Sequence, residues 1–166
     1  MAISIEQMNG LDKERFVVLL GTIFEHSPWI AEAAWPLRPF ASAEELHAVM
    51  MNIVRESRTE TIVDLFRSHP DLGTRLAVAE YSAKEQQGAG LHRLTPEEYG
   101  RFDELNRTYV ERFGFPFILA VRGKTKEDIL ASMEERLRHT ASEEAETALS
   151  EIAKITGFRL KDLITE

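Results

Sequence analysis

The chain has 166 residues, and its 20 lysines and arginines against 28 aspartates and glutamates give a net charge of −8. It has no cysteine, which excludes disulfides, thiolate metal ligands and a cysteine nucleophile. With 43% apolar residues, it is expected to form a single folded domain over residues 1–166. A chain of this length buries roughly 70% of its unfolded surface and needs no covalent or metal staple.

Charge and apolar patterning also restrict the partners. Nucleic acids and anionic membranes attract basic surfaces, so the net charge favours neither as the main partner. No segment reaches the roughly 18 uncharged apolar residues of a membrane span. Residues 1–16 lack the basic region and apolar core of a secretory signal, and residues 163–166 (LITE) are not a peroxisomal address. We therefore expect a cytoplasmic protein.

Signals for helix starts recur along the chain. In a capping box, Ser or Thr precedes the helix and Glu or Gln follows three residues later, so that two backbone N–H groups are satisfied reciprocally. The spacing occurs at Ser4/Gln7, Ser42/Glu45, Ser57/Glu60, Ser82/Glu85 and Thr95/Glu98, with Thr125/Asp128 as a weaker variant. Five such matches indicate a chain built mainly of helices.

Apolar residues repeat at helical spacing between these signals, as in Leu46, Met50 and Ile53. The pattern predicts helices near 12–25, 28–35, 43–55, 58–67, 83–88, 96–113, 126–139 and 143–156, then a short turn near 158–164. Gly114 and Gly157 stand where glycines end helices. The strand-like run 115–121 is too short and isolated to build a sheet, and Pro116 weakens it. The expected fold is all-α, an irregular bundle of about eight or nine helices.

His69 and Pro70 follow the helix expected over 58–67. Pro70 cannot continue a helix, and it biases His69 toward an extended conformation. The imidazole would then project from a helix end into a loop, where functional groups are common. The alternative is a histidine that contacts the last helical carbonyls.

Ser82 and Glu85 are open to two interpretations that do not exclude each other. Their spacing is that of a capping box. The functional alternative pairs Glu85 with His69 as a carboxylate and an imidazole for proton transfer. Gly88 and Gly90, which follow, allow close approach of the backbone.

Residues 113–118 (FGFPFI) are too apolar for a surface connection. They predict either a buried segment that packs the core or an extended backbone whose N–H and C=O groups bind a polar ligand. Arg159 follows Gly157 in the last expected turn. It is either a solvated or helix-capping residue, or a fork for a carboxylate or planar amide.

The histidines fit no metal motif. His26, His47, His69, His92 and His139 show neither HxxxH nor HxH spacing, and Walker, Rossmann and GxSxG motifs are absent from the sequence. The residues alone therefore predict an all-α domain with a polar pocket of His, Glu and Arg. Two alternatives stay open. One is a non-catalytic helical module that binds a partner or small ligand, and the other is a metal-dependent hydrolase using His69, Asp71 and His92.

Taken together, the segments resemble the OHCU decarboxylase family, over about residues 11–163. OHCU is 2-oxo-4-hydroxy-4-carboxy-5-ureidoimidazoline, an intermediate between uric acid and allantoin. The resemblance rests on Phe24-Glu25-His26-Ser27-Pro28-Trp29-Ile30, Arg38-Pro39-Phe40, His69-Pro70-Asp71-Leu72-Gly73, Ser82, Glu85-Gln86, Gly88-Ala89-Gly90-Leu91, Asn106, Tyr109, Phe113-Gly114-Phe115-Pro116-Phe117-Ile118 and Arg159-Leu160. No single piece is specific, but the combination in this order is.

The resemblance implies an all-α homodimer that decarboxylates OHCU to (S)-allantoin without a metal or an organic cofactor. It assigns catalysis to His69, Glu85 and Arg159, and substrate binding to Pro70, Ser82, Gln86, Phe117 and Ile118. The substrate can delocalise the electron pair left by CO2 as an enolate, so the reaction needs neither pyridoxal nor thiamine.

The residue types suit that chemistry. Arg159 and backbone N–H groups could stabilise the oxyanion, and His69 changes charge near neutral pH, as proton transfer requires. For Glu85 three roles stay open, because it could set the tautomer of His69, hold the substrate's hydroxyl and N–H groups, or disfavour the bound carboxylate.

Overall fold

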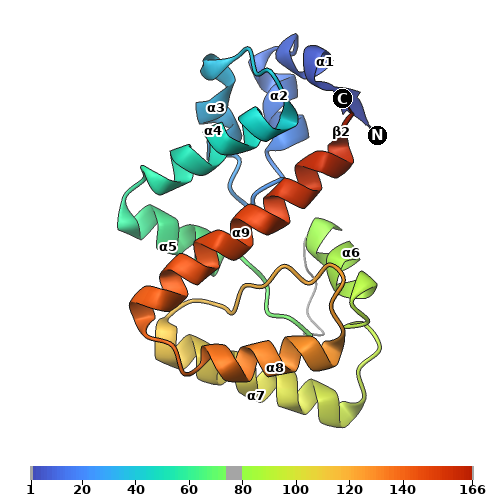
Figure 1. The fold of residues 1–166 in the computed structure, drawn as a ribbon, viewed down its shortest axis with the longest axis vertical. Coiled ribbons are helices and arrows are strands. Elements are labelled where there is room, and N and C mark those ends of the chain that lie inside the picture. The colour runs from blue at the N-terminus through green and yellow to red at the C-terminus, as the bar shows by residue number, and fades with distance from the viewer. Residues whose placement is uncertain (1, 74–79, 166) are drawn as a thin grey trace. The chain divides into compact units, whose positions relative to one another are not determined.

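The structure is a computed structural model that describes residues 2–73 and 80–165. Within these residues the chain forms nine α-helices, one short 3₁₀ helix and a pair of two-residue strands (Figure 1). The expectation of an all-α fold is therefore confirmed. None of the described helices is long and apolar enough to cross a membrane.

Through-space contacts divide the chain into two compact units. Unit 1 consists of Met1–Ser68 and Ala153–Glu166, and unit 2 of His69–Ile152. The boundary between Ile152 and Ala153 falls inside the last helix, so this helix contributes residues to both units. The expected single domain over residues 1–166 stays a prediction.

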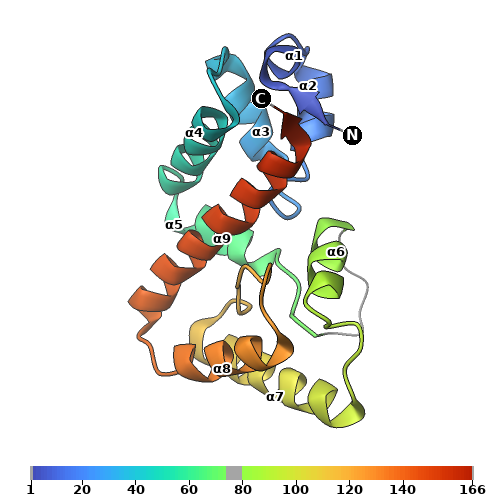
Figure 2. The ribbon, with the colours of Figure 1, turned by 45° about the vertical axis from the view of Figure 1, so that its right-hand side comes forward.

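Unit 1 contains the first five α-helices and the end of the last one. Its elements are β1 (Ile3–Ser4), α1 (Ile5–Asn9), α2 (Lys13–Leu20), α3 (Trp29–Ala34), the 3₁₀ helix η1 (Trp35–Leu37), α4 (Ala43–Arg55), α5 (Thr59–Arg67), the last turns of α9 (Ala141–Leu163) and β2 (Ile164–Thr165). β1 pairs in parallel with β2, with Ile3 opposite Ile164, which brings the ends of the chain together (Figure 2). The core includes Leu46, Met50 and Val54 of α4, all fully buried.

Unit 2 contains α6 (Glu80–Gly88), α7 (Pro96–Phe113), α8 (Lys126–Arg136) and the first three turns of α9. α7 and α8 lie side by side (Figure 1). Between them in sequence runs the extended segment 115–121, which forms no strand. Its residues Phe117 and Ile118 are 1% and 2% exposed, so the segment is part of the core of this unit.

Several helix starts and ends are as the sequence predicts. α4 and α7 have the predicted bounds, and the Thr95/Glu98 capping box forms with Pro96 in the first helical position. The boxes at Ser4/Gln7 and Thr125/Asp128 also form. Gly114 ends α7 with a φ of 81°, in the left-handed region that glycine adopts most readily.

Three predicted capping boxes do not form. Arg58 rather than Ser57 precedes α5, and the Ser57 hydroxyl donates to the Ile53 carbonyl at the end of the previous helix. Ser42 accepts from the Glu45 N–H, but the Glu45 carboxylate turns to the Ala41 N–H. Ser82 lies inside α6 rather than at its start. The spacing alone does not specify a cap, because Ser57 and Glu45 have other backbone partners within reach.

Gly157 does not end a helix, which corrects the prediction. α9 runs without interruption through the two segments expected near 143–156 and 158–164. A Cβ at Gly157 would lie 3.5 Å from Cε1 of His47, so the glycine lies where α9 passes α4. A glycine costs a helix about 1 kcal/mol relative to alanine. Burial of Ile155 and Leu160 on either side offsets this cost.

We predict opposite effects of alanine at two glycines of the α7 region. Gly114→Ala should lower the free energy of unfolding by about 1 kcal/mol, because alanine disfavours the left-handed conformation. Gly100→Ala should raise it by roughly 0.5–1 kcal/mol, because Gly100 lies inside α7 with open space around it. Urea unfolding followed by circular dichroism measures both, and a loss at Gly100 equal to that at Gly114 would contradict this account.

Candidate functional site

The residues that the sequence singles out are divided between the two units. His69, Pro70, Ser82, Glu85, Gln86, Phe117 and Ile118 belong to unit 2, whereas Arg159 belongs to unit 1. The contacts that hold these residues therefore fall into two sets, one in each unit.

The turn that follows His69 and Pro70 is held by Gln86 of α6. The Gln86 side chain accepts a hydrogen bond from the Gly73 N–H (3.1 Å) and donates one to the Asp71 carbonyl (3.3 Å). Gly73 has a φ of +69°, and a Cβ there would lie 2.9 Å from the ring of Phe102. The turn therefore requires glycine, and both ends of the Gln86 amide are engaged by it.

A second amide holds the same turn from α7. Asn106 is buried, and its amide donates to the Leu72 carbonyl at 2.9 Å. His69 and Pro70, directly before this turn, are half-buried. α6 also carries Ser82, which is buried, and Glu85, which is half-buried and directly precedes Gln86. The pairing of Glu85 with His69 stays a prediction.

Asp71 is the titratable group of this turn with an altered proton affinity. Partial burial raises the pKa of its carboxyl group above the ordinary value, and the negative charge of Asp103 on α7 adds to this effect. The folded chain therefore disfavours the ionised form of Asp71.

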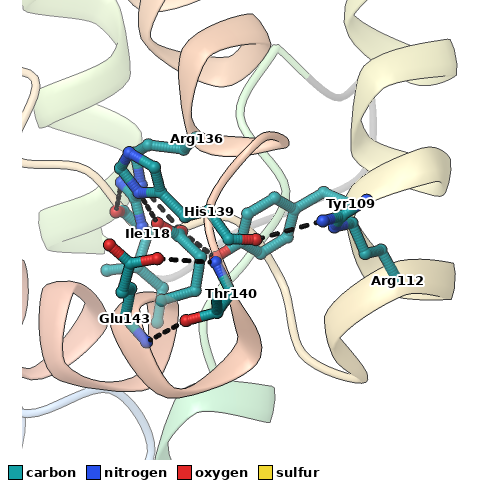
Figure 3. Close-up of polar contacts among 8 residues, drawn as sticks. Tyr109, Arg112, Ile118, Arg136, His139, Thr140 and Glu143 are labelled. Atoms are coloured by element: carbon teal, nitrogen blue, oxygen red, sulfur yellow. Dashed lines mark hydrogen bonds and ion pairs between the residues drawn. The ribbon is translucent and has the colours of Figure 1, made fainter.

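The extended segment is held by a buried ion pair of α8 and α9. Arg136 donates from Nη1 to the Ile118 carbonyl at 2.5 Å, and from Nε to Oε1 of Glu144 at 2.8 Å. Figure 3 shows Arg136 beside Ile118, with Tyr109 entering from α7. The side chains of Arg136 and Glu144 are 6% and 0% exposed. Water therefore contributes little to screening this pair.

Glu144 also accepts hydrogen bonds from two further side chains. The Tyr109 hydroxyl donates to its Oε1 at 2.5 Å, and Nδ1 of His139 lies 2.7 Å from its Oε2. Burial, followed by the hydrogen bond to the carboxylate, raises the pKa of Tyr109, so the phenol keeps its proton. Glu151, two turns further along α9, accepts from the Ala120 N–H at 3.0 Å.

Arg159 is neither solvated nor at a helix end, which corrects the simpler expectation for it. It is 2% exposed inside α9, and it donates to Oε1 of Glu25 (2.8 Å) and to the Ile23 carbonyl (2.9 Å). The Glu25 carbonyl in turn accepts from the hydroxyl of Ser68, which directly precedes His69. The residue after Glu25, His26, has a φ of 46° and is exposed.

Sequence reasoning missed Arg136, Glu144 and Glu151, and it gave Glu25 no role in the site although Glu25 belongs to the segments that carry the resemblance. For the two glutamates of α9 a signal was available. Glu144, Ala148, Glu151, Ile155 and Arg159 recur at intervals of four, three, four and four residues, so they share one helical face. Charged residues on an apolar face are rarely buried without partners, so this pattern indicates buried polar contacts.

The remaining features to consider are a possible metal site and a groove in unit 1. Within residues 2–73 and 80–165, no group of three or more His, Asp or Glu side chains is arranged to hold a metal ion. Unit 1 has a groove of about 660 Å³ between α4 and α9, lined in part by His47, Gly157 and Lys161. Burial lowers the pKa of His47, whose Nε2 lies 2.9 Å from Oγ1 of Thr156. None of the eight expected site residues lines this groove.

The fold and these contacts define an all-helical protein whose candidate catalytic groups lie just before a fixed turn (His69), on helix α6 (Glu85) and inside helix α9 (Arg159). The sequence model of the OHCU decarboxylase family matches residues 9–161. The chain belongs to the OHCU decarboxylase family.

Individual relatives agree with this assignment. The "2-oxo-4-hydroxy-4-carboxy-5-ureidoimidazoline decarboxylase" of Halalkalicoccus jeotgali is 42% identical over 97% of this chain and 92% of its own length. The "Uric acid degradation bifunctional protein PucL" of Bacillus subtilis is 47% identical over 98% of this chain, which spans only 33% of that protein. A crystal structure of (S)-allantoin synthase superposes with a TM-score of 0.80 at 32% identity, covering 98% of this chain and 54% of that one.

The raised pKa of Asp71 leads to a stability prediction with a defined pH dependence. A folded-state pKa above the unfolded one means that stability falls as pH rises through the interval between them. Asp71→Asn removes this loss and should raise the free energy of unfolding at pH 7. The gain should shrink as the pH falls toward the ordinary aspartate value of 3.8.

The comparison variant is Asp103→Asn, measured by urea unfolding at the same pH values. It removes only the smaller cause of the pKa shift, and it also breaks the exposed ion pair between Asp103 and Arg107. Its gain at pH 7 should therefore be smaller than that of Asp71→Asn. A gain from Asp71→Asn that is the same at pH 4 and pH 7 would show that the carboxyl charge is not the cause.

Proposed function

We propose that this chain catalyses the decarboxylation of OHCU to (S)-allantoin in the breakdown of uric acid. The observation that carries the proposal is the match to the Halalkalicoccus jeotgali decarboxylase, which is nearly end to end in both chains. The likeness to a structure named (S)-allantoin synthase supports the product and its handedness.

At the ring carbons, the reaction breaks one C–C bond and forms one C–H bond. The C–C bond to the carboxylate breaks, CO2 leaves, and the bonding electron pair is delocalised into the conjugated ring of the substrate. A proton then adds to the neighbouring ring carbon, which carries the ureido group, and forms the new C–H bond, while the hydroxyl group on the carbon that lost CO2 gives up its proton and becomes a ring carbonyl. Because the ring itself accepts the electron pair, we propose that the reaction proceeds without a metal or an organic cofactor. The protein contributes orientation, charge stabilisation and delivery of the proton to one face.

His69 is the proposed proton donor, because an imidazole exchanges a proton near neutral pH. The hydrogen bonds of Gln86 and Asn106 to the turn at 71–73 support this role, since they fix the chain directly after His69. Glu85 and Ser82, on the helix that carries Gln86, are proposed to bind the polar groups of the substrate. Pro70 and Gln86 would form part of the wall, with Gln86 acting mainly through the turn.

Arg159 and the backbone N–H groups of Phe117 and Ile118 are proposed to stabilise the negative charge that develops on the substrate. The ion pair between Arg159 and Glu25 supports this role, because it holds the guanidinium in one orientation inside unit 1. We further propose that the protein acts as a homodimer in the cytoplasm. Sedimentation at micromolar concentration tests the dimer.

The test of the reaction generates OHCU in solution from uric acid and follows the circular dichroism of the product. OHCU also decays without enzyme, and that decay gives racemic allantoin. Addition of this protein should speed the decay and produce an optical signal of the (S) isomer. Racemic product at the spontaneous rate would refute the proposed reaction and favour a non-catalytic helical module. Strong chelators should leave the activity unchanged, and inhibition by them would favour the metal-dependent alternative.

We predict that His69→Asn abolishes the optical signal while changing the free energy of unfolding by less than about 1 kcal/mol, because His69 is half-buried at a helix end. The two quantities are measured by the decay assay and by urea unfolding on the same preparation. Retained stereoselective activity would remove His69 from the mechanism.

Arg159→Ala should behave differently, because it loses activity and stability together. Breaking a buried ion pair leaves an uncompensated charge, here that of Glu25, and costs about 3–5 kcal/mol. Lys161→Ala is the matched control on the same helix, since Lys161 is exposed and lies outside the proposed site. If Arg159→Ala were as stable as the control, the Glu25 pair would not stabilise the fold.

A further inference from the structure

We propose that Arg136, neutralised by Glu144, is a positioning residue for the reaction because it fixes the Phe117–Ile118 segment against which the substrate binds. The inference rests on the proposed function, since that function gives this segment its role. Arg136 and Glu144 do not themselves reach the substrate in this proposal. They act through the segment.

Arg136 contacts both residues that are proposed to line the substrate. Its Nη1 donates to the Ile118 carbonyl, and its guanidinium carbon lies 4.3 Å from the centre of the Phe117 ring. Within the described residues, its Nη2 is buried and has no hydrogen-bond partner. The guanidinium of Arg136 therefore contacts an aromatic ring and a backbone carbonyl oxygen.

The charge of Arg136 is tolerated in the core because Glu144 lies against it. Glu144 is fully buried and accepts from Nε of Arg136, from the Tyr109 hydroxyl and from His139. The Tyr109 ring also packs edge-on to Phe117, with ring centres 5.4 Å apart. One carboxylate thus orients both groups that contact Phe117.

A second carboxylate of α9 fixes the segment two residues further on. Glu151 accepts from the Ala120 N–H, and it is seven residues after Glu144, on the same face of α9. The carbonyl of Ile118 and the N–H of Ala120 are therefore both fixed by side chains that α9 holds, directly or through Arg136. This matters because residues 115–121 belong to no helix or strand that would fix their peptide planes.

These contacts restrict the direction of the Ile118 N–H, because they hold the residues on either side of that peptide group. That group lies between two fixed points, the ring of Phe117 and the carbonyl of Ile118 itself. A donor to developing negative charge is effective only when its direction is set before the reaction. Arg136 therefore contributes to catalysis by preorganising the neighbouring backbone donors, and it should influence kcat more than KM.

The test compares Arg136→Lys with Arg101→Lys. Lysine keeps the charge at position 136 but cannot contact Glu144, the Ile118 carbonyl and the Phe117 ring at once. Arg101 of α7 forms an exposed ion pair with Glu134 of α8, the helix that carries Arg136, so its replacement is a matched control. Three experiments are made: steady-state kinetics that give kcat and KM for OHCU on the folded fraction, the ratio of allantoin enantiomers corrected for spontaneous decay, and hydrogen exchange of residues 115–121.

For Arg136→Lys we expect kcat to fall by about a hundredfold, the magnitude that follows from a displacement of about 1 Å, with a much smaller change in KM. The excess of (S)-allantoin should fall and exchange in 115–121 should speed up. Arg101→Lys should leave all three at wild-type values. The enantiomer ratio does not depend on how much enzyme is folded, so a purely structural role would not change it.

If folded Arg136→Lys keeps the wild-type kcat and enantiomer ratio, the positioning role is refuted while the proposed reaction stands. If the wild-type protein itself gives racemic allantoin at the spontaneous rate, the proposed reaction fails and the positioning role fails with it. Should Arg136→Lys not fold, Tyr109→Phe replaces it, because it removes only the hydroxyl that donates to Glu144. That variant should lower kcat and the (S) excess in the same sense, and wild-type values of both would refute the proposal.

Discussion

The last helix carries charged side chains on the face that it buries, and the contacts of both units depend on how they are neutralised. Glu144 and Glu151 interrupt an apolar face in unit 2, and Arg159 does so in unit 1. An isolated charge on such a face would be too costly to bury, so each one determines what lies opposite it. Arg136 and the segment around Ile118 provide the partners of the two glutamates, and Glu25 provides the partner of Arg159.

The same constraint applies at two candidate site residues that lie where regular secondary structure stops. His69 follows the end of α5, and Ile118 lies in an extended segment between α7 and α8. Backbone outside helices and strands needs partners from side chains, and the amides of Gln86 and Asn106 provide them at the turn as Arg136 and Glu151 do at the segment. Polar atoms that would otherwise require water are thereby fixed in a buried environment, which is the condition under which dipoles stabilise a reacting charge.

Local sequence patterns predicted the parts of the structure that depend on neighbours in the chain. The bounds of α4 and α7 follow from apolar spacing, and the capping box at Thr95 from four residues. Features set by distant residues were not predictable in this way. Gly157 stays helical because of packing beside α4, and Arg159 is buried by a glutamate 134 residues earlier in the chain. The site residues came from a resemblance spread over the whole chain, whereas the supporting residues Arg136, Glu144 and Glu151 belong to none of its segments.

Gln86 illustrates how a buried turn distinguishes side chains of equal size. Its oxygen faces an N–H and its nitrogen faces a carbonyl, so the amide fits in one orientation. Glutamate has the same shape, but it would present an oxygen to the Asp71 carbonyl and add a negative charge beside a carboxyl group that already resists ionisation. The turn therefore discriminates between these side chains by the pattern of donors and acceptors and not by volume. Spontaneous deamidation, which converts Gln to Glu, would damage the turn without changing its packing.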